Sequence, residues 1–198
     1  MRIHGKGIVG LEFAMIGEMT GKLFAGNLLF AACCVTYLIW WSVAFRPGFT
    51  APGALKIGLF TVTALLGIMG LAWIVQGCSL ANSGTHFVGI IAASAAAYVI
   101  LLLLTNMLMH RQVTTELMLI VFWACMEVCA CNALLGGGAI SGKAFAVLVA
   151  IVLAAAIAGM ICYLKYYDLL PMTAFYDGMV PLILFALVMI GIAIYIKV

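Results

Sequence analysis

Charged residues are scarce in this chain. Only 8% of its 198 residues are Asp, Glu, Lys or Arg, whereas 68% are hydrophobic. A soluble domain typically has about a quarter charged and about half apolar residues, and it could not hide this much apolar surface from water. The scarcity of charge therefore excludes an ordinary soluble domain and a disordered chain. The net charge of +3 is too small and too scattered to indicate a nucleic-acid partner.

Regular alternation of polar and apolar residues is also missing. A transmembrane β-barrel would show segments of about ten residues that alternate in polarity, and this chain has continuous apolar runs instead. A helix needs about 20 mainly apolar residues to cross a bilayer. The runs therefore predict an all-α, polytopic integral membrane protein. We expect it to lie in the cell membrane, in contact with the lipid bilayer.

Six apolar stretches are interpreted as membrane-spanning helices, and together they predict a six-transmembrane-helix bundle over residues 23–198. They are Leu23–Phe45, Leu55–Gly77, Phe87–His110, Glu116–Leu135, Lys143–Leu164 and Asp177–Tyr195. The short connections between them contain turn-forming Gly, Pro and Asn residues. No connection is long enough for a soluble domain, so any function must lie inside the bundle or at its faces.

Residues 1–22 are predicted to form a separate segment. Glu12 and Glu18 interrupt its apolar residues, which does not fit a signal peptide. We expect a short amphipathic helix on the membrane surface, with a frayed tail as the alternative. Lys and Arg are divided almost equally between the two sides of the bundle. Because three of them lie before the first predicted span, the positive-inside rule favours cytoplasmic termini.

The even spacing of the six helices raises the question of an internal repeat. The centres of the last three helices follow those of the first three by roughly 90 residues. A unit with three crossings must face the opposite way in its second copy, which gives two inverted three-helix repeats. The alternative is that evenly spaced helices produce the same offset without any repeat.

Small residues mark the faces on which membrane helices pack closely. On this basis we expect the second, third and fifth predicted helices to form the tight part of the bundle. Their small residues are Gly58, Gly67 and Gly70, then Ala92, Ala93, Ala96 and Ala97, and finally Ala154, Ala155, Ala158 and Gly159.

Glu127 is the residue that most needs an explanation, because it lies in the middle of the fourth predicted helix. A carboxylate at the centre of a bilayer costs roughly 3 kcal/mol or more, and its removal from water favours the protonated form. Trp123 and Cys131 share its helix face. We predict that Glu127 binds a proton, a cation or a polar solute, together with Trp123. The alternative is a protonated Glu that hydrogen-bonds a neighbouring helix.

Further polar residues in the apolar region are secondary candidates. Asp177 opens the sixth predicted helix and would cap it. Because Pro181 cannot donate to the Asp177 carbonyl, the alternative is a broken helix whose free backbone groups line a cavity. Asn106 and Asn132 are the other two secondary candidates. They and Asn27, which is not itself proposed for the site, could bridge neighbouring helices or form a polar path past the buried carboxylate.

Signatures of metal binding and of catalysis are weak. Cys125, Cys129 and Cys131 lie on one helix and could hold a soft metal ion as thiolates. No CxxC pair accompanies them, and we interpret them as packing residues. The sequence also has no phosphate-binding glycine loop and no zinc-protease motif. We therefore predict no metal site and no cofactor, and a role other than catalysis is favoured.

The sequence predicts a small membrane transporter or channel that moves a small solute or ion through the bundle core. Glu127 would link this movement to protons. The alternative is a membrane-embedded accessory or substrate-binding subunit of a larger transporter complex, a comparison that rests on size alone. A further alternative is a membrane enzyme that acts on lipid. The small size of the chain favours a homo-oligomer.

Overall fold

The computed structural model describes residues 4–81, 84–109 and 115–197, and it describes side chains for residues 14–81, 87–107 and 117–197. In this part of the chain all regular structure is helical. The helices are α1 (His4–Phe45), α2 (Gly53–Leu80), α3 (Gly84–Met109), α4 (Thr115–Gly136), α5 (Gly142–Tyr166), α6 (Pro171–Asp177) and α7 (Val180–Lys197).

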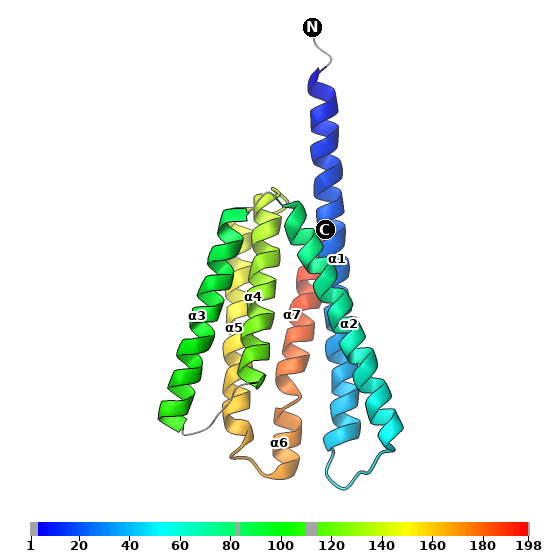
Figure 1. Cartoon of the computed structure of the whole chain (residues 1–198), viewed down its shortest axis with the longest axis vertical. Helices are drawn as coiled ribbons and strands as arrows, with labels where there is room; N and C mark the ends of the chain where they lie inside the picture. The colour runs from blue at the N-terminus through cyan, green and yellow to red at the C-terminus, as the bar shows by residue number, and fades with distance from the viewer. Residues whose placement is uncertain (1–3, 82–83, 110–114, 198) are drawn as a thin grey trace.

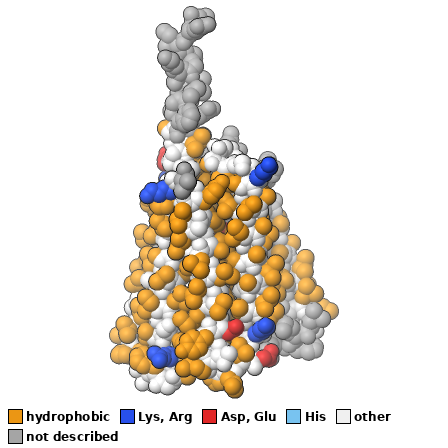
Figure 2. All heavy atoms as spheres, turned by 180° about the vertical axis from the view of Figure 1, so that it is seen from behind, with side chains coloured by type: hydrophobic (Ala, Val, Ile, Leu, Met, Phe, Trp, Pro, Cys, Tyr) orange, Lys and Arg blue, Asp and Glu red, His pale blue; other side chains and the backbone are white. Residues whose placement is uncertain are grey.

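Six helical segments of the described chain are long and apolar enough to cross a membrane. They are Ala14–Phe45, Gly53–Leu80, Phe87–Met107, Leu117–Gly136, Gly142–Tyr166 and Pro171–Lys197, of which the last combines α6 and α7. On the face shown in Figure 2, charged side chains lie near the two ends and hydrophobic side chains cover the region between them. The prediction of an all-α protein with six long apolar helices is therefore confirmed.

The long helices run alternately up and down through the bundle (Figure 1). The N-terminal part of α1 extends beyond the other helices at the upper end, and α7 ends toward the same side. The connection between α4 and α5 also lies at this end, whereas the connections from α1 to α2 and from α5 to α6 lie at the opposite end. We call the first the upper end of the bundle and the second the lower end.

Helix α1 is a single helix of 42 residues. An amphipathic segment at residues 1–22, separate from a first span that begins at Leu23, is expected from the sequence, but the helix continues through this boundary without a break. The Glu18–Lys22 ion pair, with a nitrogen–oxygen distance of 2.9 Å, lies at this boundary. Pairs with this i,i+4 spacing stabilise helices, and no proline interrupts the backbone hydrogen bonds there.

Helix α4 is the most buried of the six spans. It packs against α2, α3 and α5, while α7 packs against α1 and α5. Ala130, Cys131 and Leu134 of α4 have no exposed surface, and the same holds for Met189 and Ala193 of α7. The core therefore lies along α4 and α7.

The closest helix contacts occur between α1 and α2. A Cβ atom on Gly26 would lie 2.5 Å from Ile74 Cγ1 and 3.1 Å from the Gly70 carbonyl oxygen. A Cβ atom on Gly77 would lie 2.7 Å from Leu23 Cδ2. Glycine at these positions lets the two backbones approach closely, as expected for helices that pack inside a membrane.

The predicted role of α3 in tight packing was wrong. Its small residues are exposed, and Thr105 is its only described side chain that is buried. In α5, Ala155 and Gly159 are buried, and a Cβ atom on Gly159 would lie 2.9 Å from Phe185 Cζ of α7. A run that is apolar on every face gives no sign of which face meets another helix, and this explains the error for α3.

The inverted repeat is not shown by the structure. It would make α3 equivalent to the last span, yet α3 lies at the edge of the bundle against α4, whereas α7 lies in the core (Figure 1).

The close contact of α1 with α2 can be tested by Gly70→Val. The new Cβ atom would lie 2.6 Å from Phe30 Cδ2 and 3.2 Å from the Gly26 carbonyl oxygen. We expect the free energy of unfolding to fall by about 1–3 kcal/mol, as for other overpacked sites, in chemical unfolding of the protein in mixed micelles. Gly58→Val is the matched control, because nothing lies within 4 Å of a Cβ atom there. Equal effects of the two changes would contradict this contact.

Candidate functional site

The Glu127 side chain has no exposed surface, and neither of its carboxyl oxygens has a hydrogen-bond partner among the described residues. The residue lies on α4, the helix that the bundle encloses most completely. A buried polar group without a partner costs roughly 1–3 kcal/mol, and more when it is charged. Native proteins rarely keep such a group unless it serves a purpose beyond stability.

Four other side chains in the described part of the chain have a buried polar atom without a hydrogen-bond partner. These atoms are Asn27 Oδ1, Trp123 Nε1, Asn132 Nδ2 and Asp177 Oδ2. With Glu127, this set contains four of the five residues that the sequence analysis proposed for the site. The fifth, Asn106, is exposed on α3, so the structure does not bring it to Glu127.

Asn27 was not among those five residues, although its position in the first apolar run was visible in the sequence. It has no exposed surface, and its Nδ2 donates to the Leu23 carbonyl oxygen at 3.0 Å. Its Oδ1 remains free to accept a hydrogen bond from another group. Asn27 and Glu127 are thus both fully buried and both able to accept a hydrogen bond.

Helix register places Asn27 and Glu127 at nearly the same height in the bundle. The Met19 side chain lies against Gly137, where it would be 2.5 Å from a Cβ atom, and α1 and α4 run in opposite directions (Figure 1). Asn27 follows Met19 by eight residues and Glu127 precedes Gly137 by ten. At about 1.5 Å per residue, the two side chains differ in height by about 3 Å.

Glu127 also lies near the face of α1 that carries Asn27. It is near enough to Cys34 of α1 and Cys78 of α2 to interact electrostatically with both thiols. Asn27 and Cys34 are seven residues apart, so they lie on one face of α1, two turns from each other. We call Asn27 and Glu127, two fully buried side chains at similar height in the core between α1, α2 and α4, the buried polar layer; no hydrogen bond joins them.

Trp123 closes the core below this layer. It lies one turn before Glu127 on the same face of α4, and its ring stacks on Phe185 of α7 with a centroid distance of 4.0 Å and an interplanar angle of 13°. Phe185 in turn packs on Gly159 of α5. The stack therefore joins three helices directly beneath the carboxyl group.

Asn132 and the three cysteines of α4 point in several directions. Asn132 is half-buried and lies about 140° around the helix from Glu127. Cys125 lies beside Cys129 and Ser94 of α3, whereas Cys131 lies near Cys78 of α2. Among the described residues, no group of three or more His, Cys, Asp or Glu side chains could hold a metal ion.

Asp177 does not open a helix, contrary to the predicted cap. It ends α6, the Gly178 N–H donates to the Ala174 carbonyl oxygen at 2.9 Å, and α7 begins at Val180. The last span is thus broken at this point, as in the alternative given in the sequence analysis, but the cavity that this alternative also predicted is not shown. Because Pro181 has no N–H group, it cannot extend the hydrogen bonds of α7 back to the Asp177 carbonyl.

Trp41 of α1 packs against this break. Its indole N–H donates to the Phe175 carbonyl oxygen at 3.1 Å. A Cβ atom on Gly178 would lie 2.8 Å from Trp41 Cζ2 and 3.3 Å from Tyr166 Cε2. Aromatic side chains from α1 and α5 therefore fill the space beside the break.

Glu127 and Asp177, the two acidic residues proposed for the site, do not lie together. The Trp123–Phe185 stack sets the register of α4 and α7, which run in the same direction (Figure 1). Asp177 precedes Phe185 by eight residues, and Glu127 follows Trp123 by four. At about 1.5 Å per residue, the two carboxyl groups lie about 18 Å apart along the bundle, on opposite sides of the stack.

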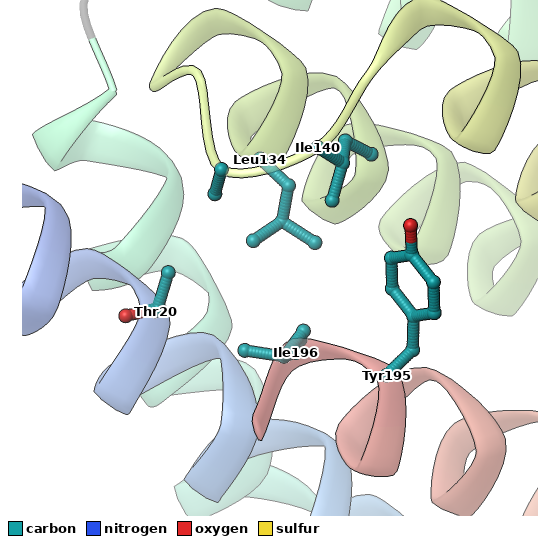
Figure 3. A pocket seen from close by; sticks show the side chains of 6 residues that line it. Thr20, Leu134, Ile140, Tyr195 and Ile196 are labelled. Carbon is teal, nitrogen blue, oxygen red and sulfur yellow. The ribbon is translucent and has the colours of Figure 1, made fainter. Parts of the chain in front are cut away.

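A pocket of about 230 Å³ opens at the upper end of the bundle (Figure 3). Thr20 comes from α1, Leu134 from α4, and Tyr195 and Ile196 from α7, and the side chains shown in the figure surround a common space. Ala139 and Ile140 of the α4–α5 connection complete the lining. None of the residues proposed from the sequence lines this pocket. It was missed because Thr20 was placed outside the first span, and because it depends on how the connection folds.

A shallower groove of about 600 Å³ lies between α5 and α7. Its lining is mostly apolar and includes Val147, Ile151 and Leu187, all of which are exposed. In a membrane this groove would face lipid.

No protein-family model, curated protein or solved structure matches this chain.

The cost of the unpartnered carboxyl group can be tested by Glu127→Met. Methionine has a similar length and no hydrogen-bonding requirement, so we expect the free energy of unfolding in mixed micelles to rise by about 1–3 kcal/mol. Glu18→Met is the control, because an exposed ion pair such as Glu18–Lys22 contributes about 0–1 kcal/mol. A loss of stability in Glu127→Met would instead indicate that Glu127 makes a structural hydrogen bond.

Proposed function

We propose that this protein is a small membrane transporter or channel that moves a small solute or ion through the bundle core, linked to protons through Glu127. The observation that carries the proposal is the fully buried Glu127 carboxyl group, which has two oxygens without a partner. Ionisable groups inside membrane spans are costly and commonly mark ion or substrate paths.

The chemistry of the buried layer fits an exchangeable ligand. A protonated Glu127 can donate one hydrogen bond, while the ionised form can only accept. Asn27 Oδ1 is an acceptor and the Trp123 indole N–H is a donor, and both lack partners. Protonation of Glu127 therefore changes which polar groups the layer can bind, and this supports coupling between a proton and a small polar solute or cation.

A purely structural role is a poorer fit. A Glu that only joined two helices would be expected to form a hydrogen bond with a neighbouring helix, because an unmade buried bond is expensive. Among the described residues neither Glu127 oxygen forms one. An ionised Glu127 without a cation would cost still more, so a proton or another cation is the natural partner of this group.

Replacement of Glu127 by Gln tests the proton linkage directly. We expect proton uptake into proteoliposomes, driven by a potassium diffusion potential and followed with a pH-sensitive dye, to fall by about a hundredfold, because Gln cannot exchange a proton. The dependence of the remaining flux on pH should also be lost. Glu18→Gln is the control, because Glu18 is exposed on α1. Unchanged uptake and pH dependence in Glu127→Gln would refute the proposal.

The buried layer can be tested separately from the carboxyl group by a matched pair of Asn→Leu changes. We expect Asn27→Leu to reduce proton uptake in the same proteoliposome assay, because it removes the Oδ1 acceptor level with Glu127. Asn106→Leu should leave uptake unchanged, because Asn106 is exposed on α3. A larger effect of Asn106→Leu would place the path along α3 and contradict the site described above.

A further inference from the structure

We infer that the pocket in Figure 3 is the aqueous entrance through which protons and small polar solutes reach Glu127, and that the Leu134 side chain closes it. This inference rests on the proposed function and adds to it the end of the bundle from which the buried layer is reached.

The pocket and the buried layer lie on the same faces of the same helices. Thr20 lines the pocket and precedes Asn27 by seven residues on α1, and Leu134 lines it and follows Glu127 by seven residues on α4. Residues seven apart share one helix face and are about 10 Å apart along the axis. The buried layer therefore lies directly beneath the pocket, about two helical turns below it.

Helix α7, which forms the third wall of the pocket, shows the same spacing of seven residues between pocket and core. Ile196 of α7 lines the pocket, and Met189, seven residues earlier, has no exposed surface. Each of the three helices thus has a residue that lines the pocket and another, two turns below, in the buried core. This continuity distinguishes the pocket from the α5–α7 groove, which lies on the outer face of the bundle.

The barrier between the pocket and Glu127 is about two helical turns deep. Its large side chains on α1 and α4 are Leu23 and Leu134, neither of which has exposed surface. The neighbouring core positions on α4 and α7 hold the small residues Ala130 and Ala193. Leu134 also lines the pocket, whereas Leu23 does not. A change of the Leu134 rotamer is therefore the smallest movement that would extend the pocket downward.

The chain folds back over the end of α4 and thereby shapes the pocket. The Leu134 carbonyl oxygen accepts hydrogen bonds from the Ala139 N–H at 2.8 Å and from the Ile140 N–H at 3.4 Å. Gly138 has a positive φ of 70°, which glycine adopts without strain. This turn places Ala139 and Ile140 against the space above Leu134.

The surroundings of the pocket favour water over lipid. The Glu18–Lys22 pair flanks Thr20 on α1, and Lys197 follows Ile196 at the end of α7. Charged side chains of this kind mark the aqueous end of a membrane bundle. Since a water molecule occupies about 30 Å³, 230 Å³ holds several waters or one small solute.

The rate at which the Glu127 carboxyl proton exchanges with D₂O tests this entrance without measuring transport. It can be followed in proteoliposomes by infrared spectroscopy of the protonated carboxyl band, assigned as the band that Glu127→Gln removes. Ala139→Trp should fill the pocket and slow the exchange severalfold. Leu134→Ala should remove the barrier and accelerate it. Ala146→Trp, on the exposed face of α5, is the matched control and should leave the rate unchanged.

Only variants that elute and unfold like the parent protein are compared. Because Ala139 is exposed, we expect Ala139→Trp to fold even if Leu134→Ala does not. If Ala139→Trp slows exchange no more than Ala146→Trp, or if Leu134→Ala does not accelerate it in a folded protein, the inference is wrong. The proposed function fails by a different result, namely proton uptake that is unchanged in Glu127→Gln. A Glu127→Gln variant without uptake, combined with unaltered exchange in Ala139→Trp, would mean that protons reach Glu127 by another route.

Discussion

The enclosure of α4 is the constraint on which the other features of this protein depend. Packing against α2, α3 and α5, together with the stack of Trp123 on α7, leaves Glu127 without exposed surface. Around it the bundle supplies apolar side chains and thiols, which are weak hydrogen-bonding groups. The tight glycine contacts of α1 with α2 stabilise one wall of this enclosure. The stability of the bundle therefore keeps Glu127 buried, although this is the side chain whose burial costs the most free energy.

The broken last span gives the two membrane acids different surroundings. Glu127 lies in an intact helix, whose backbone satisfies its own hydrogen bonds. Asp177 lies where α6 ends, beside a backbone that Trp41 and Tyr166 pack against. The Trp123–Phe185 stack lies between the two acids. A single polar path from one to the other would have to pass this stack, so each acid has to be explained by its own neighbours.

The sequence was sufficient to predict the six apolar helices and the special position of Glu127, because both follow from the length of apolar runs and the position of one charge within them. It could not predict which face of each helix is buried. Asn27 and Asn106 both lie in apolar runs, yet one is fully buried and the other exposed. An apolar helix has no polar face to fix its rotation, so only contacts between helices distinguish the two. The pocket was beyond prediction for a related reason, since it depends on a connection that folds back onto α4.

The barriers on the two sides of Glu127 differ in kind. Toward the upper end lie aliphatic side chains interspersed with alanines, and a pocket begins about two helical turns away. Toward the lower end, two stacked aromatic rings join α4, α5 and α7. A leucine rotamer can change without moving the backbone, whereas separating a stack held by three helices requires the helices to move. The packing on the two sides of this carboxyl group is thus unequal, and the proposed entrance from the upper end depends on that difference.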